Sequence, residues 1–156
     1  MLVKENQRLK KKIKKLENQL NFCELTKARS RFSYTEILKA RDKELKLVLA
    51  LDIRAFGDYN VRYGHSEGNK VLKMFVEKLQ HIFRSKDAVY RWGGDEFVVI
   101  LYGVTNLVAI NRRLEEKKIF DIAYVGYAYG EERVYSLAKR AFWYVEEMKR
   151  INHSLK

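Results

Sequence analysis

The chain has 156 residues, of which 47% are hydrophobic, and a formal net charge of +12 at pH 7. This length and apolar content suffice for one sizeable core, so we expect one globular domain with an extension. No apolar run approaches the roughly 20 residues of a membrane-spanning helix, the N-terminus lacks the apolar segment of a signal peptide, and the single cysteine, Cys23, excludes an internal disulfide. We therefore expect a cytoplasmic protein without a membrane span.

The basic charge is unevenly distributed along the chain. Seven Lys or Arg against two Glu fall within residues 1–22, and the remaining excess suits a protein that handles polyphosphate. This distribution argues against nucleic acid as the partner. A protein that binds an anionic surface through the lysine-rich segment is an alternative that rests on charge alone.

The first 22 residues have the spacing of a coiled coil. Leu2, Leu9, Leu16 and Cys23 share one heptad position, and Asn6, Ile13 and Leu20 share another. A single Asn at an a-type position favours two strands, so we predict a stalk helix over residues 1–22 that forms a homodimer, followed by a domain over residues 23–156. The alternative is an amphipathic helix that packs on its own domain.

The elements after the stalk alternate between helical and strand patterns. They are a helix over 34–43, a strand over 45–52, a helix over 66–83, strands over 88–92 and 97–102, a helix over 106–117, a strand over 119–128 and a helix over 134–151. This order of elements resembles the ferredoxin-like palm of nucleotide cyclases and polymerases. We therefore expect an α+β fold with a central antiparallel sheet.

Residues 91–97 read RWGGDEF, with two glycines between apolar runs that look like strands. Such a turn brings backbone close to a ligand, and Asp95 and Glu96 supply the hard oxygen donors that Mg²⁺ prefers. A plain hairpin with an acidic turn is the alternative, but a chance match to this string would be rare. Asp52 ends a predicted central strand, so it would meet Asp95 if the two strands are neighbours.

These motifs resemble those of the GGDEF family, the diguanylate cyclase domains of bacterial second-messenger signalling. The pentapeptide GGDEF is the family's motif, and a second matching stretch contains Asp52, Phe56, Asn60, Gly64-His65 and Gly68. Arg84 and Asp87 match the family's RxxD inhibitory motif. The resemblance covers roughly residues 23–152 and implies that two GTP molecules are condensed into cyclic di-GMP, with a homodimer and an upstream sensor domain or partner protein.

The resemblance also implies roles for individual residues. Catalysis would depend on Asp52, Asp95 and Glu96, and Mg²⁺ or Mn²⁺ would be held by Asp52, the Ile53 carbonyl, Asp95 and Glu96. Backbone amides of residues 54–57 would cradle the triphosphate. Substrate binding would involve Arg54, Phe56, Asn60, Asn69 and Arg150, although Phe56 also suits a core aromatic. Product inhibition would involve Arg84 and Asp87.

Several residues depart from the family pattern. A phosphate-binding Lys is replaced by Glu146, and an Asp that contacts guanine is replaced by Asn69, which offers one acceptor where a carboxylate offers two. Residues 23–31 keep only part of the family's D-x-L-T-G-L-x-N-R stretch. The alternative to an active cyclase is therefore a catalytically degenerate GGDEF domain that senses GTP or cyclic di-GMP and passes its state to a partner.

Overall fold

The structure, a computed structural model, describes residues 2–33, 41–83, 89–104 and 106–154. A five-stranded sheet forms its centre, with strand order β1-β3-β4-β2-β5. The strands are β1 (Arg29–Ser30), β2 (Lys46–Ile53), β3 (Val89–Arg91), β4 (Glu96–Tyr102) and β5 (Ala123–Gly130). β2 pairs antiparallel with β4 and β5, β3 pairs antiparallel with β4, and only the short β1 adds a parallel pairing among the described residues. The predicted palm with a central antiparallel sheet is confirmed.

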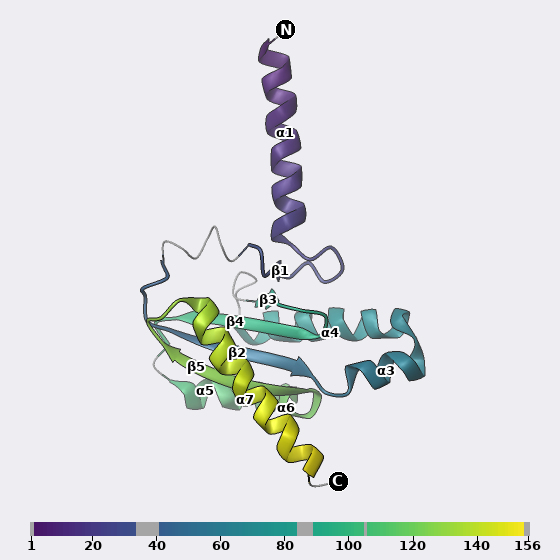
Figure 1. The fold of residues 1–156 in the computed structure, drawn as a ribbon, viewed down its shortest axis with the longest axis vertical. Helices are drawn as coiled ribbons and strands as arrows, with labels where there is room; N and C mark the ends of the chain where they lie inside the picture. Colours follow the sequence, from purple (N-terminus) through teal and green to yellow (C-terminus); the bar gives the residue numbers. More distant parts are fainter. Residues whose placement is uncertain (1, 34–40, 84–88, 105, 155–156) are drawn as a thin grey trace.

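Helices cover both faces of this sheet (Figure 1). The helices of the described residues are α1 (Leu2–Asn21), α3 (Phe56–Tyr63), α4 (His65–Phe83), α5 (Leu107–Glu116), α6 (Ile119–Ile122) and α7 (Val134–Ser154). Alternate residues of a strand point to opposite faces. Leu47, Leu49, Leu51 and Ile53 of β2 therefore pack in the cluster that contains α4, α5 and α6, whereas Val48 and Ala50 pack in the cluster that contains α7.

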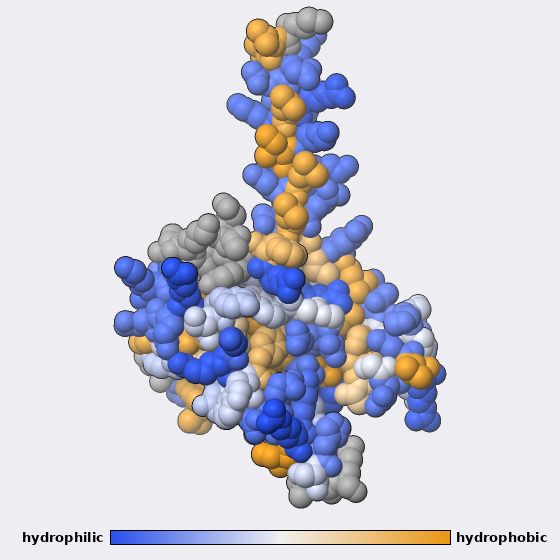
Figure 2. Space-filling model, viewed as in Figure 1, coloured by the Kyte–Doolittle hydropathy of each residue, from blue (hydrophilic) through white to orange (hydrophobic). Residues whose placement is uncertain are grey.

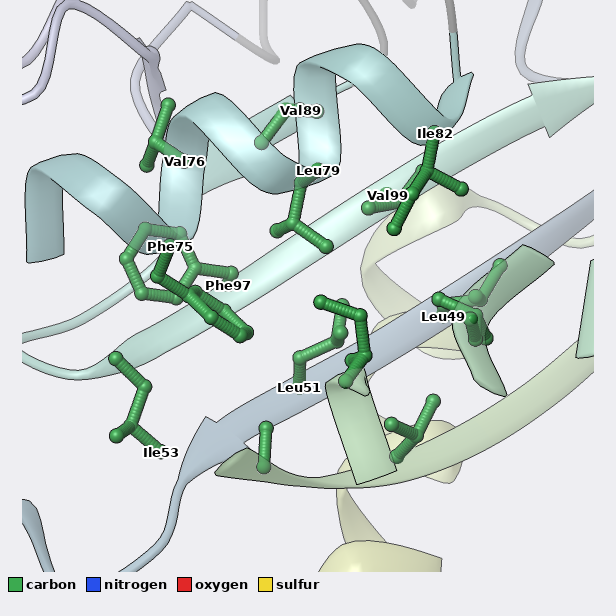
Figure 3. Packing of buried hydrophobic residues seen from close by; sticks show 14 of the residues in the cluster. Leu49, Leu51, Ile53, Phe75, Val76, Leu79, Ile82, Val89, Phe97 and Val99 are labelled. Atoms are coloured by element: carbon green, nitrogen blue, oxygen red, sulfur yellow. The ribbon is translucent and has the colours of Figure 1, made fainter. Parts of the chain in front are cut away.

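The core between the sheet and α4 is shown in Figure 3. Phe75 and Leu79 of α4 point onto β4 and β2, and the rings of Phe75 and Phe97 lie 5.1 Å apart at their centroids. On the other face, α7 approaches β5 closely, because a Cβ at Gly126 would overlap the Ala141 carbonyl oxygen. Gly126 thus fixes α7 against the sheet, and the C-terminal turns of α7 run past the end of β2.

Most predicted elements are present, but one strand was predicted wrongly. Residues 119–128 do not form a single strand, because residues 119–122 form the helical turn α6 and β5 begins at Ala123. Lys118 adopts a left-handed conformation with φ 55°, which turns the chain so that Ile119 becomes fully buried. An apolar run this short suits a strand and a buried helical turn equally well. The structure also contains β1, which the sequence patterns did not indicate.

The predicted helix over 34–43 falls mostly on residues 34–40, outside the described part of the chain. Arg41 to Glu44 form a turn in which the Glu44 amide donates to the Arg41 carbonyl. Among the described residues, no helix combines the length and apolar character needed to cross a bilayer.

The α1 helix stands away from the rest of the molecule as a single rod (Figure 1). None of its residues is buried, and its apolar side chains form a stripe along one side (Figure 2). The stripe contains the predicted heptad residues Leu2, Leu9, Ile13, Leu16 and Leu20. The alternative in which this helix packs on its own domain is therefore wrong over most of its length.

Candidate active site

The register of β2 and β4 places two carboxylates opposite each other. Asp52 is the cross-strand partner of Glu96, and alternation along the strands puts both on the α7 face of the sheet. Like charges directly opposite each other destabilise a sheet. This pair is unfavourable for the sheet, and Asp52 is only 6% exposed. Its presence therefore indicates a function.

The third carboxylate, Asp95, comes from the turn between β3 and β4. The Asp95 carbonyl accepts a hydrogen bond from the Ile53 amide at 3.2 Å, so the turn lies beside the end of β2. Within the turn, a Cβ at Gly93 would overlap the Glu96 carboxylate, so this glycine makes room for the Glu96 side chain. The turn therefore brings Asp95 and Glu96 to Asp52 although 43 residues separate Asp52 from Asp95.

Asp52, Asp95 and Glu96 form a carboxylate cluster, and Lys149 of α7 lies against it. Its Nζ donates to Asp52 Oδ2 at 2.8 Å and to Glu146 Oε1 at 2.9 Å. The side chain of Lys149 is 27% exposed and that of Asp52 is 9% exposed, so this ion pair is largely shielded from water. Glu146, which the family resemblance marked as a charge reversal, thus contacts an ammonium of its own helix.

The cluster carries more negative charge than Lys149 neutralises. Burial raises the pKa of Asp52, and Asp95 and Glu146 raise it further although Lys149 lowers it. Burial also raises the pKa of Glu96, followed by the charges of Asp52 and Asp95. Burial lowers the pKa of Lys149, but its hydrogen bonds to Asp52 and Glu146 outweigh this and raise it overall. The pKa values of the two carboxyls are therefore raised mainly by burial, whereas the pKa of Lys149 is raised by its acidic partners.

An open hollow of about 660 Å³ adjoins the cluster. It is lined by the end of β2, the first turn of α3, Asp95, Tyr124 and the C-terminal part of α7. The lining residues are Asp52, Ile53, Arg54, Ala55, Phe56, Gly57, Asp58, Asp95, Tyr124, Lys149, Asn152 and His153. Its opening to solvent and its size suit a nucleotide-sized ligand.

The oxygen donors on this hollow fit a divalent cation. Asp52, Asp95 and the Ile53 carbonyl all line it, and the surplus of negative charge favours a cation there. Among the described residues, no three Asp, Glu, His or Cys side chains lie close enough to enclose a metal by themselves. Two carboxylates with a carbonyl are still a reasonable set for Mg²⁺, which usually takes one or two carboxylates and completes its shell with water and substrate phosphates.

The structure brings together some of the predicted site residues and separates others. Asp52, Ile53, Arg54, Phe56 and Asp95 line the hollow. Glu96 lies in the carboxylate cluster but does not line the hollow. Asn60, Asn69 and Arg150 do not line the hollow either. Arg84 and Asp87, the predicted inhibitory pair, fall outside the described residues.

Three of these residues have contacts that bear on their predicted roles. Asn69 is exposed on α4, and Arg150 is exposed on α7 with Nη1 donating to Glu147 at 2.9 Å. Asn60 Oδ1 is buried and has no hydrogen-bond partner among the described residues, and it lies against Gly68. A buried acceptor without a partner costs stability, so it suits a position that a ligand donor satisfies.

Arg54 is held firmly at the rim of the hollow. Its Nε donates to the Phe120 carbonyl at 3.2 Å, and its guanidinium lies 3.9 Å from the centroid of the Tyr124 ring. The Arg54 amide donates to the Ile122 carbonyl at 2.8 Å, so this amide is not available to bind a phosphate. The part of the predicted phosphate cradle that remains is the first turn of α3, where no side chain caps the helix and the early amides lack intrahelical partners.

Sequence reasoning missed Asp58, Tyr124, Lys149, Asn152 and His153, which all line the hollow. One signal was available for Lys149, because it lies three residues after Glu146 and therefore on the same face of a helix. No comparable signal marked Tyr124, whose place follows from its register opposite Asp52 on β5.

Comparisons with known proteins identify the family of this chain. A family model described as "Diguanylate cyclase, GGDEF domain" matches residues 25–119. Among curated proteins, the chain is 38% identical over 96 residues to the probable diguanylate cyclase DgcI of Escherichia coli, a match that covers 61% of this chain and 22% of that protein. It is 37% identical over 91 residues to the diguanylate cyclase DgcS of Shewanella oneidensis, covering 54% of this chain and 31% of that protein. The chain therefore spans less than a third of the length of DgcI and about a third of DgcS.

Solved structures share the fold. The coiled coil and GGDEF domain of DgcB from Caulobacter crescentus, in complex with c-di-GMP, superimposes with a TM-score of 0.79 at 18% identity and covers 95% of this chain and 90% of that one. The diguanylate cyclase SiaD from Pseudomonas aeruginosa, in complex with its activator SiaC, gives a TM-score of 0.73 at 21% identity over 96% of this chain and 66% of that one. The matched residues include the RWGGDEF turn and the end of β2 that together form the carboxylate cluster, and the chain belongs to the GGDEF family.

Proposed function

We propose that this domain is a diguanylate cyclase that condenses two GTP molecules into cyclic di-GMP. The observation that carries the proposal is the meeting of Asp52, Asp95 and Glu96 beside a hollow of about 660 Å³. Of the two curated relatives, DgcS is a diguanylate cyclase and DgcI a probable diguanylate cyclase, which supports the same reaction for this chain.

The reaction requires the 3′-hydroxyl of one GTP to attack the α-phosphate of another and expel pyrophosphate. A divalent cation such as Mg²⁺ or Mn²⁺, held by Asp52, Asp95 and the Ile53 carbonyl, would stabilise charge on the phosphoryl oxygens and help to ionise the hydroxyl. Glu96, half-buried beside Asp52 with a raised pKa, is the neighbouring carboxylate that a leaving proton could reach. The amides of the first turn of α3 and the cations Arg54 and Lys149 would contact the triphosphate.

A single hollow holds one nucleotide, so the reaction needs two domains facing each other. The apolar stripe of α1 offers the means, because a two-fold coiled coil would bring two copies together. We therefore assign residues 1–22 to a dimerising stalk and residues 23–156 to the GGDEF domain. Product inhibition through Arg84 and Asp87, and input from an upstream sensor domain or a partner protein, belong to the same proposal.

The test is product formation by variants that change one carboxylate. Asp52→Asn and Asp95→Asn keep the shape of the side chain and remove its charge, and we expect each to lower cyclic di-GMP formation from GTP and Mg²⁺ or Mn²⁺ by at least about a hundredfold. Asp121→Asn is the matched control, because Asp121 is exposed on α6 and does not line the hollow. Product is measured by chromatography.

A second candidate function is a degenerate GGDEF domain that senses a nucleotide. The observation that favours it is Glu146, a carboxylate near a site that must accept a triphosphate, with Lys149 already engaged by Asp52. A wild-type domain that forms no product at high concentration, yet binds GTP or cyclic di-GMP in calorimetry, would support this second function and exclude the first.

A further inference from the structure

The Lys149 ammonium occupies the place where the charge of a metal ion is needed. Its Nζ lies 2.8 Å from Asp52 Oδ2, an oxygen of a carboxylate that would hold the metal. Asp52 is almost fully buried and sits on a central strand with pairing on both sides, so its carboxylate cannot turn away to meet a cation elsewhere. A cation that enters the hollow and binds Asp52 therefore meets Lys149.

Lys149 is the partner that can move. It lies on the last three turns of α7, its side chain is 27% exposed, and it carries its charge on a flexible four-carbon stem. Asp52 and Glu146 hold its ammonium by ion pairs, and the Glu146 side chain is 57% exposed. A divalent cation on Asp52 would repel the ammonium at this short range.

The hollow offers a second place for the ammonium. Lys149, Asn152 and His153 line the hollow from α7, and the first turn of α3 lines it as well. Arg54 is fixed by the Phe120 carbonyl and the Tyr124 ring, and Arg150 is bound to Glu147 outside the lining. Of the Lys and Arg side chains described on α7, Lys149 alone lines this hollow.

We propose that Lys149 is an exchangeable internal cation, which neutralises Asp52 when no metal is bound and moves to the nucleotide phosphates when a divalent cation takes its place. The proposal rests on the proposed function for the presence of a metal and a triphosphate in this hollow. It assigns to Lys149 the phosphate contact that Glu146 cannot make. Binding of the metal and of the nucleotide then becomes cooperative. The metal displaces the ammonium from Asp52, and the nucleotide phosphates give the displaced ammonium a new partner.

The test is a pair of binding measurements on Lys149→Met, which keeps the length of the side chain and removes its charge. Mn²⁺ alone is titrated and the free ion is followed by electron paramagnetic resonance. The nucleotide is 3′-deoxy-GTP, which lacks the attacking hydroxyl and cannot be converted, titrated by calorimetry at saturating Mn²⁺. We expect Mn²⁺ to bind about tenfold more tightly and 3′-deoxy-GTP about tenfold more weakly than in wild type, each corresponding to about 1.4 kcal/mol.

Three further variants control the experiment. Lys139→Met removes a charge from an exposed position of the same helix, away from the hollow, and should change neither affinity. Lys149→Arg keeps the charge and should retain the nucleotide affinity of wild type within about threefold. Lys149→Gln repeats the loss of charge with a polar side chain, and a circular-dichroism melt of each variant checks that the fold is intact.

Affinities for Mn²⁺ and nucleotide that stay unchanged, or that move in the same direction, would overturn the exchange. A tighter Mn²⁺ site without any loss of nucleotide affinity would also overturn it, since Lys149 would then be a counter-ion only. Neither measurement requires product. If the wild-type domain forms no product but Lys149→Met binds Mn²⁺ more tightly and 3′-deoxy-GTP more weakly, the proposed cyclase is contradicted and the exchange is supported. If the domain is active but Lys149→Met shows neither shift in affinity, the cyclase is supported and the exchange is contradicted.

Discussion

Arg91 joins Cys23 to the glycine turn of the RWGGDEF motif. Its Nη1 donates to Cys23 Sγ at 3.2 Å, while Nε and Nη2 donate to the Gly94 carbonyl at 3.1 Å and 2.6 Å. Cys23 lies two residues after the end of α1, and its own amide donates to the Ala28 carbonyl at 2.8 Å. One guanidinium therefore links the base of the stalk to the turn that carries Asp95.

This contact predicts an acidic thiol whose reactivity depends on Arg91. Burial raises the pKa of Cys23, but hydrogen bonds from Thr26 and Arg91 outweigh it and lower the pKa overall. Because the thiolate is the nucleophile, Arg91→Met should move the pH profile of alkylation by iodoacetamide to higher pH and slow the reaction at pH 7. Arg112→Met, which removes a charge from the distant helix α5, should leave the profile as in wild type. A profile that Arg91→Met does not move would show that Arg91 does not influence the thiol.

Gly68→Ala should weaken nucleotide binding through Asn60. A Cβ at Gly68 would overlap Asn60 Oδ1 and press on Phe56, so the Asn60 side chain must turn away. Asn60 matches the family's guanine-contacting residue, and loss of one hydrogen bond of about 1 kcal/mol to 1.5 kcal/mol weakens affinity up to about tenfold. Calorimetry with 3′-deoxy-GTP measures the effect, and Lys73→Ala on the exposed side of α4 is the control. Equal affinity in Gly68→Ala and wild type would remove Asn60 from the binding site.

Lys27→Gly should stabilise the domain. Lys27 has φ 58°, in the left-handed region that costs a residue with a Cβ roughly 1 kcal/mol, and the family pattern has glycine at this position. Because glycine also gains entropy in the unfolded chain, we expect the free energy of unfolding to rise by only about 0.5 kcal/mol. Lys73→Gly, inside α4, should instead lower it by about 1 kcal/mol. Urea unfolding followed by circular dichroism measures both, and a loss of stability in Lys27→Gly would contradict the expectation.

Periodicity predicted the elements whose burial pattern is regular over several turns or residues. The apolar residues of α4 recur at helical spacing and all eight residues of β2 are buried, so both were predicted within one residue of their observed bounds. The break at Lys118 was not predictable, because a left-handed residue other than glycine leaves no mark in the sequence. β1 was missed because two residues carry no periodicity.

The site was predictable where a motif marks a residue and unpredictable where two distant elements meet. Asp52 and Asp95 followed from the strand end and the glycine turn. The pairing of Asp52 with Glu96 depends on the register of β2 and β4, and the ion pair with Lys149 depends on the closeness of α7 at Gly126. Neither the strand register nor the position of the helix can be predicted from a local sequence pattern.

The stalk should hold the protein together as a dimer. The apolar side chains of α1 are open to solvent, with Ile13 54% and Leu20 61% exposed, and a lone helix of 20 residues with such a stripe is marginally stable in water. A two-stranded coiled coil would bury this stripe along the whole helix. Ile13→Glu with Leu20→Glu places charges within that seam, so we expect a monomer in light scattering and loss of cyclic di-GMP formation, which needs two half-sites. The melt of the globular part should stay unchanged, because no residue of α1 belongs to its core. Asn18→Glu adds the same kind of charge on the opposite side of the helix and should leave the dimer intact. A wild-type protein that is monomeric, or a double variant that remains dimeric and active, would show that the stalk does not mediate the association.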